Sequence, residues 1–411
     1  MNKEKRRVPK LRFPGFTEDW EQRKLGDFYT FKNGLNKEKV YFGYGDSIVN
    51  FTDVFHNRQI YSSTLKGKVC VNKKELENYK VKEGDLFFTR TSETIDEIGF
   101  PAVVMEPMER VVFSGFVLRG RAEKNDPLVN IFKSYIFFTD NFRSEMKKKS
   151  SMTTRALTSG TALKEMYFSY PKDLEEQTKI GEILLRLDNI ITLHQRKLEH
   201  LNLKKKALLQ KLFPKNGERH PELRFPGFTD AWEQRKLSEV VTINPKTELP
   251  DEFKYVDLES VVGTNLLGFK VIKKENAPSR AQRLASYGDV FYQTVRPYQR
   301  NNYLFENVDK DVVFSTGYAQ LRSKLDSYFL LTLVQNDNFV KVVLDNCTGT
   351  SYPAINGSEL GKITVQIPSN EVEANQIGKV FRGIDKSITL HQRKLEHLQL
   401  QKKALLQQMF V

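Results

Sequence analysis

The chain has 411 residues, which is enough for two or three domains that each bury a core of their own. Its composition, 39% hydrophobic and 28% charged, is globular, and no apolar run approaches the ~18 to 20 residues that cross a bilayer, so we expect no membrane insertion. The formal net charge of +14 and a pI near 9.4 predict a polyanionic partner, nucleic acid above all, because lysine and arginine neutralise phosphates.

The opening stretch, MNKEKRRVPKLRF, is basic but lacks the apolar segment and small-residue cleavage site of a secretory signal. We therefore expect a cytoplasmic protein. The two cysteines, Cys70 and Cys347, lie in different halves of the chain and have no CxxC spacing. This spacing predicts free thiols rather than a disulfide framework or a zinc finger.

A lead-in sequence occurs twice. LRFPGFTEDWEQRKL at 11–25 returns as LRFPGFTDAWEQRKL at 223–237, an offset of 212 residues. The Pro-Gly pair in each copy breaks any helix, so we expect a turn that leads into a domain and a packing role for the lead-in.

The region after each lead-in is variable. Short β-branched and aromatic runs such as FPAVVM, VVFSGFVL, YFLLTLV and KITVQI alternate with Gly, Asn, Asp and Pro, which predicts strands and turns. Only echoes are shared, such as GDLFFTR at 84–90 against GDVFYQT at 288–294, and VVFSGF at 111–116 against VVFSTGY at 312–318. Each variable region therefore predicts one compact domain of α/β (α+β) type.

A second repeat follows each variable region, because ITLHQRKLEHL at 191–201 recurs at 388–398, an offset of 197 residues. Around it, apolar residues recur at steps that alternate between four and three, the pattern of a coiled-coil seam. The predicted seam residues are Ile180, Leu184, Leu187, Ile191, His194, Leu198, Leu201, Lys205, Leu208 and Leu212 in the first copy, and Ile377, Phe381, Ile384, Ile388, His391, Leu395, Leu398, Lys402, Leu405 and Met409 in the second.

Polar residues on this seam are expected to fix the register of the helices, at some cost in stability. A metal site is the rejected alternative, since His194 and His200 are six residues apart and face different sides of a helix. We expect the two helices to pair antiparallel within one molecule, as a rod with a globular domain at each end and an approximate twofold axis. The predicted segments are 1–171 and 216–368 for each lead-in with its domain, 172–215 for the central coiled-coil helix and 369–411 for the C-terminal one.

No motif for catalysis on DNA is visible. The sequence has no GxxxxGK[ST] phosphate loop, and FGYGDS at 42–47 reads as a turn rather than as a glycine loop that opens a helix. Asn244-Pro245 lacks the second proline and the aromatic residue of a methyltransferase motif, and PDEFK at 250–254 lacks nuclease spacing. We expect no catalytic residue, no metal and no cofactor in this chain.

Two divergent domains, each introduced by the same lead-in and followed by the same heptad helix, resemble the DNA-specificity subunit of type I restriction-modification systems. The most specific elements are the W-E-x-R/Q-K-L lead-in at 20–25 and 232–237, the helix LEEQTKIGEILLRLDNII…LKKKALLQKLF at 174–213, and its counterpart that ends at Phe410. The resemblance covers nearly the whole chain.

The first domain also matches the family's GD-[LV]-[LF]-x-x-R loop at Gly84, Asp85 and Arg90, and its Ser/Thr-rich segment at 153–159. The second domain departs from this pattern because its arginine is delayed to Arg296 and Arg300.

The helix entry departs as well. The EEQ sequence of the first copy, at 175–177, becomes Glu373-Ala374-Asn375-Gln376 in the second.

The resemblance implies a bipartite, asymmetric target in double-stranded DNA, with an unspecified spacer and one half read by each variable domain. The helices would serve as a ruler and as a docking surface for two modification (methyltransferase) subunits, which methylate adenine, and for restriction (translocase) subunits. The methyl donor, ATP and Mg²⁺ are then expected on those partner subunits. Residues 180 to 212 make a rod of about 50 Å at ~1.5 Å per residue, which matches half-sites roughly one helical turn, ~34 Å, apart.

Reading bases requires donors and acceptors on loops that enter a groove, with arginine suited to guanine and asparagine or glutamine to adenine. The candidate DNA-contacting residues are Arg90, Thr91, Ser92, Thr154 and Arg155 in the first domain, and Arg296, Tyr298, Gln299, Arg300, Asn301 and Tyr352 in the second.

Two other interpretations stay open, an autonomous tandem-domain DNA-binding protein such as a repressor, and a coiled-coil scaffold that does not touch DNA. A repressor usually gains symmetry by dimerising, whereas this chain holds both copies and has diverged them. The scaffold leaves the charge of +14 unexplained.

Overall fold

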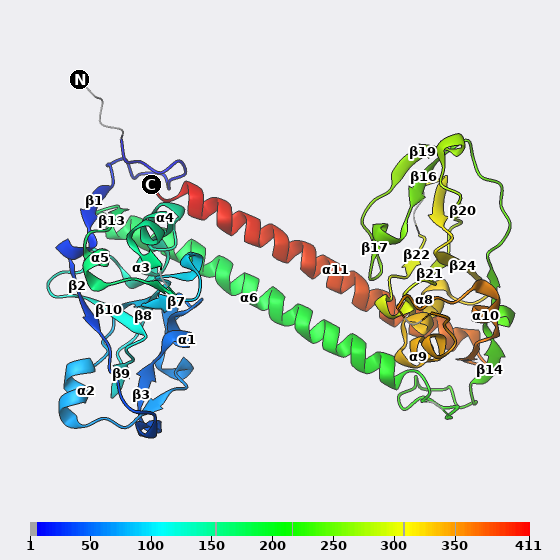
Figure 1. Ribbon diagram of the computed structural model, residues 1–411, viewed down its shortest axis with the longest axis horizontal. Coiled ribbons are helices and arrows are strands. Elements are labelled where there is room, and N and C mark those ends of the chain that lie inside the picture. The colour runs from blue at the N-terminus through cyan, green and yellow to red at the C-terminus, as the bar shows by residue number, and fades with distance from the viewer. Residues whose placement is uncertain (1–5, 153, 216, 307–308, 350) are drawn as a thin grey trace. The chain divides into compact units, whose positions relative to one another are not determined.

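The computed structural model describes residues 6–152, 154–215, 217–306, 309–349 and 351–411 (Figure 1). The chain divides into two compact units: unit 1 is Met1–His194 with Lys394–Val411, and unit 2 is Gln195–Arg393. Both boundaries fall inside the repeated ITLHQRKLEHL stretch. Each unit therefore contains one variable region and is completed by the end of the helix that follows the other variable region.

Unit 1 is built on a five-stranded sheet in the order β2 (Tyr29–Asn33), β10 (Val117–Ala122), β6 (Leu86–Thr89), β8 (Pro101–Val104) and β4 (Gln59–Ile60). Unit 1 also has two three-stranded sheets. One has the order β5 (Lys68–Val69), β3 (Phe42–Val49) and β9 (Val111–Phe113), and the other has the order β11 (Ser151–Met152), β12 (Ala156–Leu157) and β7 (Thr91–Ser92). The lead-in strand β1 (Glu21–Lys24) pairs antiparallel with β13 (Tyr167–Tyr170). The short helices are α1 (Phe51–Val54), α2 (Lys73–Tyr79), α3 (Asn130–Ile136), α4 (Asp140–Lys149) and α5 (Gly160–Lys164), with 3₁₀ turns at Leu25–Asp27, Lys39–Tyr41, Ser62–Thr64 and Ile95–Glu97.

The sheet of unit 1 is buried on both faces. Successive side chains of a strand point to opposite faces, so Leu86 and Phe88 of β6 enter one core and Phe87 enters another. The first core also holds Phe132 of α3, and all four of these side chains are fully buried. A strand buried on both faces reads as a continuous apolar run, as LFF does here.

Unit 2 repeats this plan with fewer strands. Its main sheet has the order β15 (Val241–Ile243), β24 (Tyr318–Ser323), β21 (Asp289–Gln293) and β22 (Tyr303–Leu304), and a second has the order β19 (Lys270–Lys273), β16 (Glu252–Val256), β23 (Val312–Ser315) and β20 (Ala281–Leu284). The lead-in strand β14 (Glu233–Lys236) pairs antiparallel with β25 (Thr364–Ile367), and β17 (Val261–Val262) pairs with β18 (Asn265–Leu266). The short helices are α7 (Leu237–Val240), α8 (Ser327–Gln335), α9 (Asp337–Asp345) and α10 (Gly357–Lys362), with 3₁₀ turns at Leu258–Ser260, Lys274–Asn276 and Pro297–Gln299.

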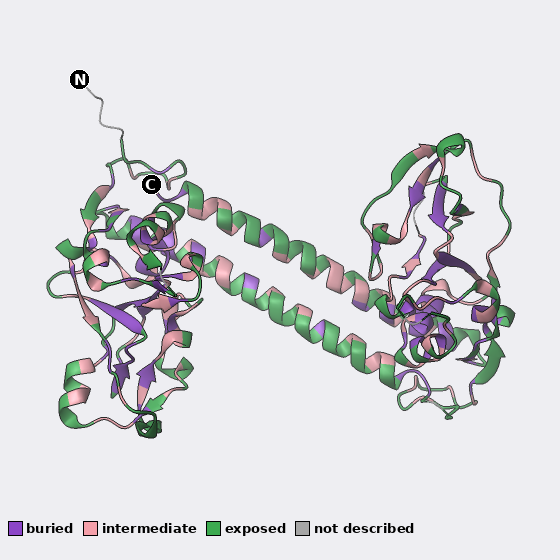
Figure 2. Ribbon diagram, viewed as in Figure 1, coloured by how far each residue is buried: buried purple, intermediate pink, exposed green. Residues whose placement is uncertain are grey.

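The two long helices expected from the heptads are present as α6 (Leu174–Lys211) and α11 (Glu371–Gln408), and the mixed helix-and-sheet class is confirmed. Every predicted seam residue is buried or half-buried (Figure 2), with Leu212 and Met409 one residue beyond the helix ends. Several leucines off the seam are strongly exposed, for example Leu193 at 66% and Leu390 at 68%, whereas Leu185, Leu209 and Leu406 are half-buried. The heptad phase therefore matches the burial along both helices.

Within each unit the two helices run antiparallel. In unit 1, the end of α11 packs against the start of α6, because Met409 shares a core with Ile180 and Lys402 forms an ion pair with Asp188 further along α6. In unit 2, Leu212 shares a core with Ile377, while Lys205 lies 2.6 Å from Asp385.

The seam lysines have defined partners in both units. The Tyr135 hydroxyl donates to Asp188 at 2.9 Å, and the Tyr328 hydroxyl donates to Asp385 at 2.7 Å, so each carboxylate binds one tyrosine and one lysine. Burial lowers the pKa of Lys402, with help from the nearby Arg58, while Asp188 opposes the shift. These contacts give the polar seam positions a role in register, because a slipped pairing would leave the carboxylates without them.

The lead-in is pinned to the long helices by a duplicated buried ion pair. Arg12 binds Glu176 at 2.7 and 2.8 Å, and Arg224 binds Glu373 at 2.8 and 2.9 Å, and both glutamate side chains are 1% exposed. The altered helix entry of the second copy therefore keeps the glutamate that the lead-in arginine needs.

A phenylalanine two residues after the end of each long helix completes an aromatic cluster. Phe410 packs edge-on against Trp20 and stacks on Phe132, with ring centroids 6.0 and 5.5 Å apart. Phe213 does the same with Trp232 and Phe329, at 5.7 and 5.8 Å. This packing is the reason why each compact unit includes the end of the other helix rather than stopping at a domain boundary along the chain.

Candidate DNA interface

The Gly-Asp loop shared by the two copies is structural. Gly84 and Gly288 have φ angles of 80° and 89°, which glycine adopts readily. Asp85 and Asp289 are buried, and each is bound by two guanidinium nitrogens, from Arg121 at 2.6 and 2.6 Å and from Arg322 at 2.9 and 2.9 Å. The loop thus fixes the start of the central strands β6 and β21, and the candidate contacts lie at the other ends of these strands.

Four of the five candidate residues of unit 1 lie close together. Two of them form strand β7, which follows β6, and the other two lie in the turn before β12, the strand that pairs with β7. Strand β7 pairs antiparallel with β12, so that Ser92 lies opposite Ala156 and Thr91 opposite Leu157. Thr154 and Arg155, which directly precede β12, are exposed, while Thr153 lies outside the described residues. Two segments about sixty residues apart in the sequence therefore form one surface, as candidates on separate loops must do to read one site.

Arg90, the fifth candidate of unit 1, is held more firmly than expected. Its side chain is half-buried and donates to the carbonyl of Gly115 at 3.4 Å, and its backbone N–H donates to the carbonyl of Phe116 at 3.0 Å. Its carbonyl accepts from the N–H of Thr158, so the arginine ties the end of β6 to the residue that follows β12. Its proposed contact with DNA stays a prediction.

A hollow of about 340 Å³ opens beside these strands and is lined by Thr91, Ser92, Glu93, Glu97, Arg155 and three phenylalanines. The Arg155 and Glu93 side chains are 68% and 86% exposed and lie 4.0 Å apart. Phe116 is 64% exposed, a large apolar surface to leave in water. Reasoning from the sequence missed Glu93 and Phe116, for which the only signal was their nearness to the candidate segment and to the VVFSGF echo.

Unit 2 has an equivalent pair of adjacent segments, one that follows β21 and one around Ala354. Val295 bridges to Ala354, and the N–H of Arg296 donates to the carbonyl of Pro353 at 2.8 Å. Arg296 therefore lies where unit 1 has Ser92, and Tyr352 lies where unit 1 has Arg155. The Arg296 guanidinium lies 4.5 Å from the centroid of the Tyr352 ring, a cation–π contact between two predicted residues 56 positions apart.

Both Arg296 and Arg300 adopt left-handed backbone conformations, with φ of 55°, on either side of the turn at Pro297–Gln299. This conformation is uncommon for residues with a side chain as large as that of arginine. Such backbone strain is concentrated at functional sites in proteins.

The other candidates of unit 2 divide into two groups. Tyr298 is 50% exposed. Arg300 lies 2.6 Å from Asp337, Gln299 accepts from the Gln293 amide at 2.8 Å, and Asn301 accepts from the N–H of Gly263 at 2.8 Å. These three side chains hold the loop in shape, and their contact with bases stays a prediction.

In the part of the chain that the structure describes, no helix combines the length and apolar character needed to cross a membrane. Among the described residues, no group of three or more His, Cys, Asp or Glu side chains is arranged so that it could hold a metal ion.

Comparison with known proteins identifies the family. Residues 17–203 and 229–400 each match the family described as the type I restriction modification DNA specificity domain. These two matches cover most of the chain, which therefore belongs to the type I restriction-modification DNA specificity family. The chain is a DNA-specificity subunit, a recognition component rather than a catalyst.

Relatives agree with this assignment, and a solved structure has a similar fold. The chain is 24% identical over 427 residues to the putative type I restriction enzyme MjaX specificity subunit of Methanocaldococcus jannaschii, covering 95% of this chain and 92% of that protein. It is 22% identical over 419 residues to the MjaVIII specificity subunit of the same organism, covering 96% and 92%. The fold is similar to the crystal structure of a type I restriction-modification S subunit from M. genitalium, with a TM-score of 0.59 at 13% identity over 98% of this chain and 99% of the other.

Proposed function

We propose that each unit reads one half of a bipartite, asymmetric DNA target through the two adjacent segments described above. One observation carries this proposal: the two units build the same pair of segments, yet place different side chains on them. Ser92 and Arg155 in unit 1 are replaced by Arg296 and Tyr352 in unit 2. A common frame with exchanged side chains is what two readers of different sequences require.

The chemistry of these side chains suits base edges. Arg155 and Arg296 can donate two hydrogen bonds to guanine, and Glu93 can accept from the amino group of cytosine. The exposed ring of Phe116 suits the methyl group of thymine. Stacking on Tyr352 restrains the plane of the Arg296 guanidinium before DNA binds, which reduces the entropy lost on binding.

The partners proposed for this chain are two modification subunits, which hold the methyl donor, and restriction subunits, which use ATP and Mg²⁺, in the cytoplasm. The names of the relatives, as specificity subunits of type I restriction enzymes, support such an assembly. The heptad pattern of α6 and α11 supports a further role for the helices in setting the spacer between the half-sites.

An exchange of segments tests the division of labour. Replacing residues 26–170 by the matching segment of another specificity subunit should change one half of the methylated motif and keep the other, as read by sequencing the modified genome. Replacing residues 238–367 is the matched control and should change only the opposite half. A change in both halves after either exchange would show that the units read DNA jointly.

Purified components separate this function from its rivals. The chain alone should transfer no methyl group, while its complex with the modification subunit should methylate adenine in the motif. A repressor would bind its site with full affinity without any partner, and a scaffold would not select a sequence. Methyl transfer by the chain alone would refute the assignment.

A further inference from the structure

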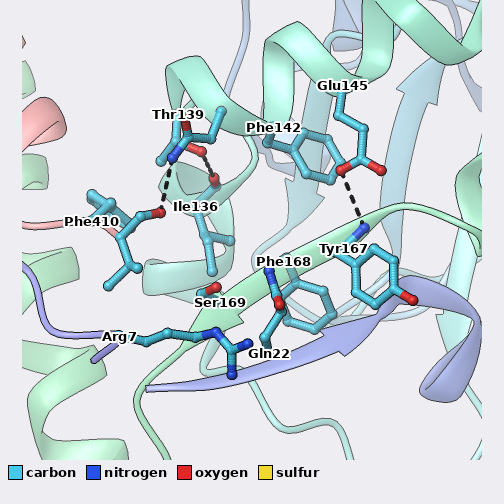
Figure 3. A pocket seen from close by; sticks show the side chains of 12 residues that line it. Arg7, Gln22, Ile136, Thr139, Phe142, Glu145, Tyr167, Phe168, Ser169 and Phe410 are labelled. Atoms are coloured by element: carbon cyan, nitrogen blue, oxygen red, sulfur yellow. Dashed lines mark hydrogen bonds between the residues drawn. The ribbon is translucent and has the colours of Figure 1, made fainter. Parts of the chain in front are cut away.

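Unit 1 contains a cavity of about 260 Å³ beside the lead-in strand (Figure 3). It lies between the ladder of β1 and β13, the turn from α3 to α4, and the residues that follow α11. Gln22 and Ser169, which are register partners in the ladder, line one side, and Thr139, Phe142 and Phe410 line the other.

Unit 2 contains the same cavity, with a volume of about 300 Å³. Gln234 and Gln366 take the places of Gln22 and Ser169, and they too are register partners. Asn336, Phe339 and Phe213 take the places of Thr139, Phe142 and Phe410. All of these positions are related by the offsets of the two sequence repeats, 212 residues for the lead-in and 197 for the helix.

A hydrogen bond at the rim is duplicated as well. The Asn141 amide donates to the carbonyl of Val411 at 3.3 Å, and the Asn338 amide donates to the carbonyl of Pro214 at 3.4 Å. The cavity and the hydrogen bond at its rim therefore occur in both units.

The contrast with the reading segments indicates what kind of partner fills this cavity. The segments proposed to read DNA carry different residues in the two units, because the half-sites differ. The cavity keeps glutamine, asparagine and two phenylalanines in equivalent places. A site that keeps these four residues in both units suits a partner that is the same in both.

The charges of the lining argue against DNA as that partner. In unit 2 the described lining residues carry no charged side chain, and in unit 1 they include one cation, Arg7, and one anion, Glu145. A surface for phosphates needs a surplus of lysine and arginine. The described lining of the two cavities has no such surplus of positive charge, although the chain as a whole has a net charge of +14.

We propose that the two cavities are equivalent sockets, each of which receives one large apolar side chain of a modification subunit. This proposal rests on the function proposed above. The phenylalanines form an apolar floor for the side chain, and the exposed amides of Gln22 and Gln234 at the rim can hydrogen-bond to the peptide groups beside it. A buried anchor in a pocket with a polar rim is the usual arrangement of the residues that dominate a protein–protein interface.

Blocking the sockets one at a time tests this proposal. Gln22→Trp and Gln234→Trp place a large ring at the mouth of each cavity, and both glutamines are exposed, so the fold should tolerate the change. Native mass spectrometry of the purified complex should show two modification subunits on the wild type, one on either single variant and none on the double variant. The affinity for a modification subunit at a blocked socket should fall at least tenfold.

Matched controls are available on the same strands. Arg23→Trp and Arg235→Trp add the same ring one residue along, on the opposite face of β1 and β14, because side chains of a strand alternate. They should leave two modification subunits bound. Gln22→Ala with Gln234→Ala, which adds no bulk, should weaken binding without abolishing it.

Three results would overturn the proposal. The first is that the double tryptophan variant binds two modification subunits with wild-type affinity. The second is that it keeps both subunits but loses binding to the motif, which would assign the cavities to DNA. The third is a wild-type complex held together by two copies of this chain that the variant separates. The exchange of segments reports which half of the methylated motif changes, whereas the tryptophan variants report how many modification subunits bind. The function proposed above can therefore hold even if the sockets fail.

Discussion

The contact between Arg296 and Tyr352 yields the sharpest prediction about recognition. Arg296→Ala removes the guanidinium, Arg296→Lys keeps its charge but not its planar fork, and Tyr352→Ala removes the ring beneath it. The backbone of the loop should persist in all three, because the N–H of Arg296 and the carbonyl of Pro353 hold it at 2.8 Å. Neither substitution at Arg296 introduces glycine, so the left-handed conformation stays comparably strained.

The magnitudes follow from the two contacts. A bidentate contact with a base is worth ~1 to 3 kcal/mol, so Arg296→Ala and Arg296→Lys should weaken binding to the motif roughly 5- to 150-fold. The cation–π contact at an exposed site is worth ~0.5 to 1 kcal/mol, so Tyr352→Ala should weaken it about 2- to 5-fold. Because the ring acts through the arginine, the double variant should lose less than the sum of the two single losses.

The assay is fluorescence anisotropy of the complex on duplexes in which each base pair of the second half-site is changed in turn. The Arg296 variants should lose affinity for the motif but not for a duplex altered at the one position that Arg296 reads. Arg235→Ala, on β14, is the control and should leave both affinities unchanged. A uniform loss on every duplex, with the salt slope reduced by ~0.9, would show a phosphate contact and refute base reading by Arg296.

Three further predictions concern the duplicated framework and its helices. Gly378→Ala should destabilise unit 2 by ~1 to 3 kcal/mol, because the added methyl group would clash with Asp326, which caps α8. Gly383→Ala is the control and should stabilise unit 2 by ~0.5 to 1 kcal/mol, because no atom lies within 4 Å of the added methyl group. Equal shifts of the two variants in thermal unfolding would refute the packing argument. Glu373→Gln should lower the free energy of unfolding by roughly 3 to 5 kcal/mol in chemical denaturation, because it leaves Arg224 without its buried partner. The exposed pair of Glu233 and Arg235 is the control, and Glu233→Gln should lower it by under ~1 kcal/mol. Adding seven residues at matching points of α6 and α11 keeps the heptad phase and adds ~10.5 Å of helix, so the spacer of the methylated motif should lengthen by about three base pairs; an active complex with the original spacer would show that the helices do not set it.

The sequence by itself determined the plan of duplication. The lead-in and the helix recur almost letter for letter, and a heptad seam is a one-dimensional pattern, so two long helices and the burial of residues such as Leu184 and Phe381 could be predicted without any knowledge of the fold. Candidates such as Ser92 and Arg296 were placed in the segments that follow GDLFFTR and GDVFYQT. These features depend on residues that are close in the sequence, and for this reason they could be predicted from the sequence.

Contacts between distant segments could not be predicted in this way. Asp85 looked like part of a contact loop, but its partner Arg121 buries it as a structural ion pair. Arg296 and Tyr352 were separate candidates until strand pairing brought their loops together.

The division into units was decided by tertiary structure as well. Phe410 and Phe213 follow the ends of two similar helices, and nothing in their local sequence says that each completes the core of the other repeat. Even the two identical glutamines of the lead-in, Gln22 and Gln234, acquire a cavity only when three segments pack around them. Burial depends on which surfaces meet in space, and the order of residues along the chain does not encode that choice in a form that a pattern can reveal.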